Sequence, residues 1–569
     1  MWFVLSLIFL LVVLTVVLSF PSVQTKVAKY ATNWLTETYD TRIELAQMRY
    51  IFPDEIVLKE VYLPDDRNDT LIYASQINLH IHGFNSVTNT AYSNGVEMDD
   101  LKFYWLTYPG DTTANFIKFI NKFSSGDTAS AKPFNLKIAD VKINNGVFQM
   151  EELGCADCYR LHVDDLNIEA SAFDLFGQYL TLDVNYMSGS DRYSVDISEF
   201  EMNFGYLPNQ ILVDNVKFKT AASTFDGSLS LNYEEISDFS DFVNKVTMIG
   251  EIDESSLNSL EIQRFGEEFP DFGQFSISGS VVGTVNDMKI EHAILDVARS
   301  THLEGNIDLR NTTTIENIFL HATDIDLRTN PEDAQFVYGL FWDTILPEQV
   351  KPLGEVHVVG NFNGYLNNFT TVAKITSDLG EVDADLYLYD PEDEGKTKYK
   401  GDVQLRKFNL GKIIGQDKLG LVTTDLSIDG RGLDPTTMNT KLNGKVSLLE
   451  FNKYGYQNIS VDGKVAKGAF NGLLKVQDPN LRLDFNGKAG FEEDTSKYNF
   501  TLDVLKADLF ALKFVEDSVS VVTGEVDIDF VALNYDKWAG DILIHNSTYE
   551  NSKNFHFFQD IIIHSEGLD

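Results

Sequence analysis

Alternation of apolar and polar residues with a period of two is the feature that most constrains this chain. On one side of one predicted strand lie Leu180, Leu182, Val184 and Tyr186, with Thr181, Asp183 and Asn185 on the other side. Successive side chains of a strand point to opposite faces, so this pattern predicts a sheet that is wet on one face only. Further apolar positions of this kind are Phe134, Leu136, Ile138, Leu229, Leu231, Leu481, Leu483, Phe485, Val526 and Ile528.

A long sheet with one apolar face must shield that face from water. It can close into a barrel, pack on a second sheet, or curl into a trough that holds an apolar ligand. No low-complexity linker divides residues 41–569, and glycine-bounded cassettes such as residues 277–283 and 426–432 suggest a repeated β unit. We expect a mainly β fold, a long, curved and twisted antiparallel-type sheet with a few short helices and no clear internal boundary.

Glycines that follow Asn, Asp or Ser punctuate the predicted strands, and several of these pairs fit hairpin turns. The pairs are Asn145-Gly146, Ser188-Gly189, Asp226-Gly227, Asp429-Gly430, Asp462-Gly463 and Asn486-Gly487. Two short helices are also expected. One covers residues 115–123, and the other opens at Asn330-Pro331, a cap followed by proline, and runs through residue 346.

The first twenty residues carry no charged side chain, and Pro21 follows them. About 20 apolar helical residues span a bilayer core of roughly 30 Å. Because no basic residue precedes the run and no small-residue cleavage site ends it, we expect a retained transmembrane anchor over residues 1–21 rather than a cleaved signal peptide. Apolar residues at helical spacing predict an amphipathic linker helix over residues 22–40. Lys26 and Lys29 follow the run, but long domains cross membranes regardless of such flanking charge.

The chain carries a formal net charge of −41. Such a surface repels nucleic-acid phosphates and anionic lipid headgroups, which argues against DNA, RNA or peripheral membrane binding. The charge favours solubility of a chain that has much apolar surface.

Few residues suggest chemistry. Cys155 and Cys158 form a CxxC between two predicted strands, which favours a local disulfide or inert thiols over a metal or redox site. His80 and His82 share one predicted strand face, and the acidic doublets near turns favour solvated surfaces over metal ligands. No catalytic, nucleotide or cofactor motif is present, so we expect neither an enzyme nor a cofactor.

Two stretches carry recognisable motifs. The first comprises the apolar run, Pro21-Ser-Val-Gln-Thr-Lys26, Phe52-Pro-Asp-Glu-Ile-Val-Leu-Lys-Glu-Val-Tyr62 and Asp69-Thr-Leu-Ile-Tyr-Ala-Ser75. The second comprises Tyr454-Gly-Tyr-Gln-Asn-Ile-Ser-Val-Asp-Gly463 and Asp478-Pro-Asn-Leu-Arg-Leu-Asp-Phe485. In these motifs the chain resembles the AsmA-like family, specifically the TamB-like translocation and assembly module subunits of Bacteroidetes-type bacteria.

The resemblance implies a bacterial inner-membrane protein with one span and a long β-taco groove in the periplasm. Such a groove would act in outer-membrane biogenesis, by carrying phospholipid between the membranes or by assembling and translocating outer-membrane proteins with a TamA-like, Omp85-type barrel. The apolar positions named above would then line the groove and contact acyl chains. Relatives are longer and end in a characteristic C-terminal domain, so a fragment or a short form is expected here.

A second hypothesis keeps the sheet but removes the cargo. In a structural or adhesive β-sandwich array at the cell surface, the apolar faces would pair with each other and form a dry core. The residues favour the groove, because apolar positions are many and interchangeable and no convergent polar cluster stands out.

Overall fold

The computed structural model describes residues 20–39, 42–111, 113–124, 135–154, 160–176, 179–191, 195–263, 270–314, 317–341, 345–391, 396–434, 437–490, 496–516, 519–532 and 537–567. The predicted anchor lies outside these residues except for Phe20 and Pro21, and so do Phe134, Cys155 and Cys158. Within the described part of the chain, no helix combines the length and the apolar character needed to cross a membrane.

Strand accounts for 69% of the structure and helix for 11%, which confirms the predicted mainly β class. The chain divides into two compact units, Met1–Ile290 and Glu291–Asp569. The division falls inside strand β15 (Asp287–Val297). The sequence shows no composition shift or linker there, because the same strand pattern continues on both sides.

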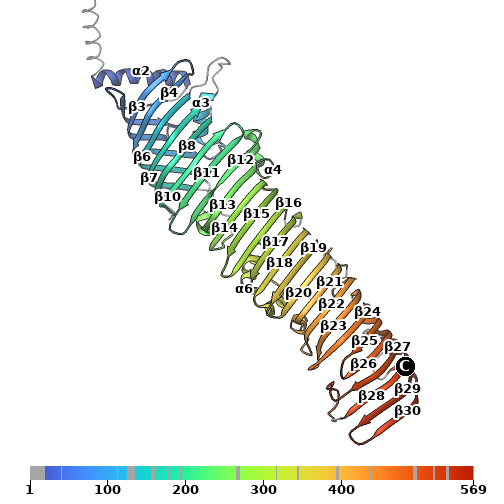
Figure 1. The fold of residues 1–569 in the computed structure, drawn as a ribbon. Coiled ribbons are helices and arrows are strands. Elements are labelled where there is room, and N and C mark those ends of the chain that lie inside the picture. Colours follow the sequence, from blue (N-terminus) through green and yellow to red (C-terminus); the bar gives the residue numbers. More distant parts are fainter. Residues whose placement is uncertain are drawn as a thin grey trace, which may run out of the picture. The chain divides into compact units, whose positions relative to one another are not determined.

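The described residues of the first unit form one long helix, several short helical segments and fourteen strands before β15 (Figure 1). The elements are α2 (Pro21–Tyr39), β1 (Gln47–Ile51), β2 (Glu55–Pro64), β3 (Thr70–Asn85), β4 (Thr90–Asp99), β5 (Lys102–Thr107), α3 (Asn115–Ser124), β6 (Asn135–Glu152), β7 (Arg160–Phe176), β8 (Tyr179–Asp191), β9 (Asp196–Ile197), β10 (Glu199–Leu207), β11 (Gln210–Lys219), β12 (Thr224–Asn232), η1 (Ile236–Asp241), α4 (Phe242–Lys245), β13 (Thr247–Asn258), α5 (Ser259–Ile262) and β14 (Gln274–Thr284). Neighbouring strands pair antiparallel, apart from β4 with β6 and β5 with β6, which are parallel.

Helix α2 covers the edge strand of the first unit. The Gln24 side chain accepts a hydrogen bond from the Tyr50 amide at 2.8 Å, and the Thr25 hydroxyl accepts one from the Met48 amide at 3.1 Å. Gln24 and Ala28 are buried against β1. An uncovered edge strand is a template for unwanted pairing, so these polar side chains give β1 the partners that a further strand would otherwise supply.

The second unit is an antiparallel meander in which each strand from β16 to β30 pairs with its neighbours in sequence. Its elements are β16 (Thr301–Arg310), β17 (Phe319–Thr329), α6 (Pro331–Phe341), η3 (Glu348–Leu353), β18 (Val356–Tyr365), β19 (Asn368–Ser377), β20 (Gly380–Tyr389), β21 (Lys398–Asn409), α7 (Leu410–Ile414), β22 (Leu419–Arg431), β23 (Asn439–Phe451), β24 (Tyr454–Ala466), β25 (Ala469–Gln477), β26 (Leu481–Gly490), β27 (Ser496–Asp508), β28 (Ser520–Ala532), β29 (Trp538–Asn551) and β30 (Phe555–Gly567).

Both of the short helices predicted within the body of the chain form. Helix α3 covers Asn115–Ser124, and α6 begins at Pro331 and ends at Phe341, before the predicted end. The Asn330 side chain caps α6, because its Oδ1 accepts hydrogen bonds from the amides of Glu332 and Asp333 at 3.0 and 2.9 Å. This is the cap that the Asn-Pro pair predicts.

The predicted turns at the Asn-Gly, Asp-Gly and Ser-Gly pairs are wrong, because those glycines lie inside strands. Gly463, Gly472 and Gly487 face one another across β24, β25 and β26, in the apolar phase of their strands. The actual turns at each end of β24 use other residues. Asn452 and Lys453 have φ of 49° and 66°, and Lys467 and Gly468 have φ of 51° and 75°. Two successive positive φ angles are typical of the tight turns that match strand twist.

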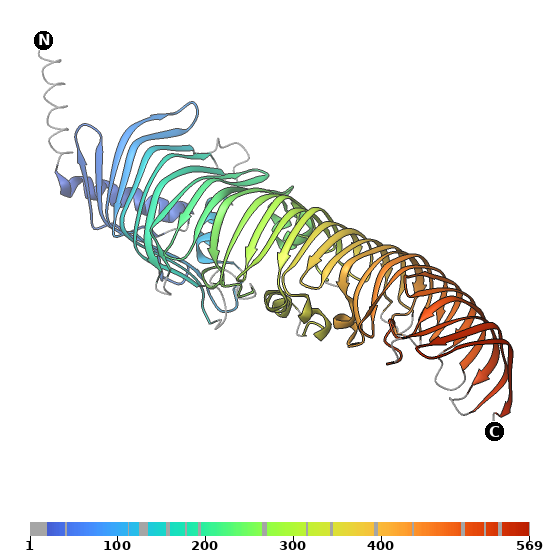
Figure 2. The same ribbon diagram turned by 60° about the horizontal axis from the view of Figure 1, so that its bottom comes forward.

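Glycines in strand interiors mark bends and close backbone approach. A Cβ on Gly487, whose φ is +138°, would lie 2.4 Å from the Asn499 carbonyl oxygen and 2.5 Å from the Phe500 Cα. The strands are bowed in Figure 2, in each unit. Because glycine has no Cβ, these residues let neighbouring strands approach closely where the sheet bends.

Replacing Gly487 by alanine is expected to destabilise the protein by about 1–3 kcal/mol, because the new Cβ collides with backbone atoms and the φ angle is strained. The midpoint of urea unfolding measures this effect. Gly83→Ala is the matched control, since no atom lies within 4 Å of a Cβ built there. Equal midpoints for the two variants would contradict the role assigned to Gly487.

Candidate functional site

The candidate site is the apolar face of each unit, built from one side of every strand. In the first unit, cross-strand partners on this face form rows. One row joins Leu136, Leu175, Leu180, Tyr206, Ile211, Leu231 and Met248. A second row joins Leu182, Phe204, Val213 and Leu229. The rows arise because strand registers align apolar positions that the sequence separates by tens of residues.

In the second unit one uninterrupted line of cross-strand partners, which we call the apolar row, runs from β17 to β30. Its members are Ile325, Gly360, Ala373, Ala384, Val403, Leu426, Gly444, Val461, Leu474, Phe485, Leu502, Val526, Ile544 and Ile561. None of these side chains is polar. With strands roughly 4.8 Å apart, the row extends over roughly 60 Å.

Aromatic rings reinforce the same face. Ring centroids lie 5.8 Å apart for Phe470 and Phe485, and 4.8 Å apart for Phe485 and Phe500. Phe530 lies 4.7 Å from Tyr498 and 5.3 Å from Trp538. These distances are typical of favourable aromatic pairs, so the rings form a broad apolar surface across β25 to β29.

Much of this face is only half-buried. The hydrophobic core of the second unit gathers around Tyr456, Ile459, Val476, Ala507 and Leu512, where the segment after β27 folds back over the strand ends. Away from that cover, the apolar row from Leu474 to Ile561 stays half-buried. A core between two packed layers would bury such side chains completely. Within the described residues, no second sheet covers this part of the row.

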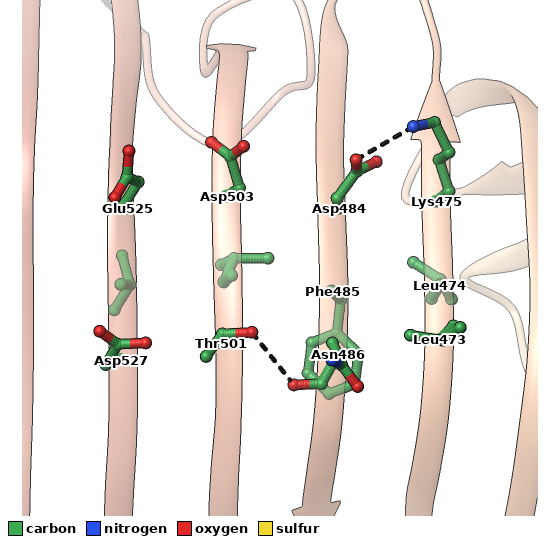
Figure 3. Close-up of a pocket in the computed structure, with 12 residues that line it drawn as sticks. Leu473, Leu474, Lys475, Asp484, Phe485, Asn486, Thr501, Asp503, Glu525 and Asp527 are labelled. Carbon is green, nitrogen blue, oxygen red and sulfur yellow. Dashed lines mark hydrogen bonds and ion pairs between the residues drawn. The ribbon is translucent and has the colours of Figure 1, made fainter.

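The opposite face is polar and rich in carboxylates. A shallow pocket of about 470 Å³ lies on β25 to β28, and Figure 3 shows the residues that line it. Lys475, Asp484, Asp503 and Glu525 form one row along it, and Lys475 pairs with Asp484 at 3.0 Å. Leu474 and Phe485 lie behind the strands in the same view. The sheet is thus a single layer that separates a charged face from an apolar face.

All twelve described candidate residues lie on the apolar faces. They are Leu136, Ile138, Leu180, Leu182, Val184, Leu229 and Leu231 in the first unit, and Leu481, Leu483, Phe485, Val526 and Ile528 in the second. Tyr186 does not join them, although the simple alternation places it there. A register shift between Glu169 and Ala170 leaves no residue of β7 opposite Asn185 in the strand register, so Tyr186 turns outward and is exposed.

The sequence analysis did not predict the glycines on the apolar face, which are Gly463, Gly472 and Gly487, or the aromatic surface. It also missed a buried carboxylate, Asp478, in the second motif. Asp478 accepts hydrogen bonds from the Tyr454 hydroxyl at 2.5 Å, the Gln457 amide at 3.0 Å and the Asn480 amide at 2.8 Å. Burial, followed by the bond to Asp478, raises the pKa of Tyr454 to about 12. The motif therefore ties the turn after β25 to the start of β24.

The other residues singled out for chemistry remain apart. His80 and His82 are both exposed, and within the described residues no group of three His, Cys, Asp or Glu side chains is placed to hold a metal ion. Asp65 accepts hydrogen bonds from the Tyr108 hydroxyl at 2.6 Å and the Asn115 amide group at 3.1 Å, so it fixes a turn. What the described residues provide is an extended apolar surface.

Comparison of the chain with protein-family models, with curated proteins and with solved structures finds no match. The geometry described above is therefore the basis for function.

Replacing Asp478 by alanine is expected to cost about 2–4 kcal/mol of unfolding free energy, because three donors lose their buried acceptor. Urea unfolding measures the loss. Asp462→Ala, an exposed carboxylate on β24, is the control and should change stability by less than about 0.5 kcal/mol. A loss at Asp478 no larger than at Asp462 would contradict the role of the buried carboxylate.

The His545 imidazole lies 2.6 Å from Asp560, and this hydrogen bond is the main reason that its pKa is raised above 6.5. A raised folded-state pKa means that the pair stabilises the fold fully below about pH 6.5, and that this contribution is lost as the pH rises through the raised value. Asp560→Asn should lower the His545 pKa in an NMR titration. The pKa of His564, which pairs with Asp541 at 2.7 Å, should not change in that variant. Equal shifts at both histidines would contradict the pairing.

Proposed function

We propose that this chain is a membrane-anchored envelope protein whose curled sheet forms a taco-like groove that carries phospholipid toward the outer membrane. The single observation that supports this proposal best is the apolar row, an unbroken line of side chains that remains half-buried over much of its length. Contiguous exposed apolar surface of this extent marks an interaction site in soluble proteins.

The energetic problem of lipid transfer fits this surface. Exposing one sixteen-carbon acyl chain to water costs on the order of 12 kcal/mol, at about 0.8 kcal/mol per methylene. The apolar row, whose larger members are Leu, Val, Ile and Phe, would remove much of that cost along its length. No member of the apolar row carries a charged side chain. No point along the row would therefore bind a lipid much more tightly than the next.

The resemblance of the N-terminal run and of the two motifs supports the remaining parts of the proposal. Residues 1–21 would anchor the chain in the inner membrane, and the body would lie in the periplasm. The charged opposite face would keep the exterior of the groove in water, while acyl chains occupy the apolar face.

Assembly of outer-membrane proteins is the second candidate. Phe555, Phe557 and Ile562 on β30 are exposed, and an unfolded polypeptide could bury its own apolar side chains against them. A structural β-sandwich array is less favoured, because its paired faces would bury the apolar row.

Site-specific photo-crosslinking in bacterial cells grown with radioactive phosphate tests lipid transfer on the full chain. A benzophenone amino acid at Leu502, on the apolar face, is expected to capture labelled phospholipid. The same probe at Asp503, the next residue and on the charged face, should capture at least tenfold less. The pair controls for expression, since the two positions are adjacent.

Leu502→Asp should reduce capture by a probe at Phe485, the cross-strand partner of Leu502, while Asn499→Asp on the opposite face should not. Lipid capture that is equal at residues 502 and 503, or absent from both, would overturn the proposed lipid cargo. Capture of a polypeptide at residue 502 would favour the assembly function instead.

A further inference from the structure

One edge of the first unit carries exposed large apolar side chains at the ends of its strands. We call Phe52, Phe84, Val87 and Phe176 the apolar rim. Phe52 is 85% exposed and Val87 is 72% exposed, and the other two are also exposed. Side chains with this exposure contribute little to the core.

The strand registers place these residues at one edge of the sheet. Phe52 lies in the turn between β1 and β2, where Ile51 pairs with Glu55, and Glu55 pairs with His80 of β3. Strand β3 continues past His80 to Asn85, so the hairpin that carries Phe84 and Val87 projects beyond that turn on the same side.

The same edge continues into the next strands. Thr90 at the start of β4 pairs with Asn135 at the start of β6, and Asn135 pairs with Phe176 at the end of β7. The opposite edge differs, because the turn between β2 and β3 there consists of Asp65, Asp66, Arg67, Asn68 and Asp69. The apolar side chains named above are therefore gathered on one edge.

Helix α2 begins beside this edge. Its first turn contacts the end of β1, since the Gln24 side chain accepts the hydrogen bond from the Tyr50 amide. Figure 1 draws α2 next to the strands of this region. Phe20, which directly precedes α2, is exposed and is the last residue of the uncharged run Met1–Phe20. The most apolar segment of the sequence is therefore joined to the fold beside the apolar rim.

From this placement we propose that the apolar rim inserts into the surface of a lipid bilayer. The inference rests on the membrane anchor of the proposed function, and it adds a second, separate contact with lipid. Exposed aromatic and aliphatic side chains bind the membrane interface through the apolar area that they bury there. The preferred surface is zwitterionic, because a chain of net charge −41 is repelled by anionic headgroups. One edge of the sheet would then stand at the lipid surface.

Depth-dependent fluorescence quenching on the full chain tests the rim. The protein is reconstituted in phosphatidylcholine vesicles that contain nitroxide-labelled acyl chains, with Cys155 and Cys158 replaced by serine. The environment-sensitive fluorophore NBD is attached at Phe52→Cys, Val87→Cys or Leu260→Cys. Leu260 is the matched control, because it is 57% exposed on α5, after the opposite end of β13.

The label at residues 52 and 87 is expected to shift to shorter emission wavelength and to be quenched at least threefold by the nitroxide lipid, whereas the label at residue 260 stays aqueous. High salt should not reverse the quenching, since the contact is apolar. Aqueous emission at all three positions would overturn the inference. So would a blue shift without quenching, which would show that protein covers the rim.

The outcome is separable from that of the lipid-transfer proposal. Lipid capture at residue 502 with an aqueous label at residues 52 and 87 would leave transfer standing and remove the rim contact. Quenching at residues 52 and 87 without lipid capture at residue 502 would do the reverse.

Discussion

The strict separation of apolar and polar side chains across a single-layered sheet is the constraint on which the rest of this structure depends. Each strand alternates, so every strand added to the sheet enlarges one apolar face and one charged face together. In the second unit, the segment of residues 508–515 covers part of the apolar face. Other parts of the apolar row stay half-buried, and the glycines at positions 463, 472 and 487 lie where neighbouring strands approach closely.

Sequence periodicity predicted the mainly β class of the fold, and it predicted that the twelve described candidate residues lie on the apolar faces, because alternation depends only on the local geometry of a strand. It did not predict which glycines turn the chain. A positive φ suits glycine both in a hairpin turn and at a bend inside a strand, and Asn486-Gly487 proves to be the second case. The distinction depends on the partner strand, which local sequence does not specify.

The remaining errors have a similar origin. Tyr186 leaves the apolar face because a bulge forms against β7, and the effect of a bulge appears only when two strands are paired. Asp478 has the sequence appearance of a surface turn residue. Three donors from two separate segments converge on it and make it a buried acceptor. Long-range pairing decides each of these cases.

The sequential meander of the second unit has a consequence for how such a chain is made. Each strand from β16 to β30 needs only the strand before it as a template, so sequence separation between partners stays short and no late strand must insert between early ones. Low contact order of this kind favours rapid, local folding. A chain that is synthesised from its N-terminus can therefore add one strand after another to a growing edge. By the same logic, gain or loss of a hairpin changes the length of the sheet while the registers on either side are kept.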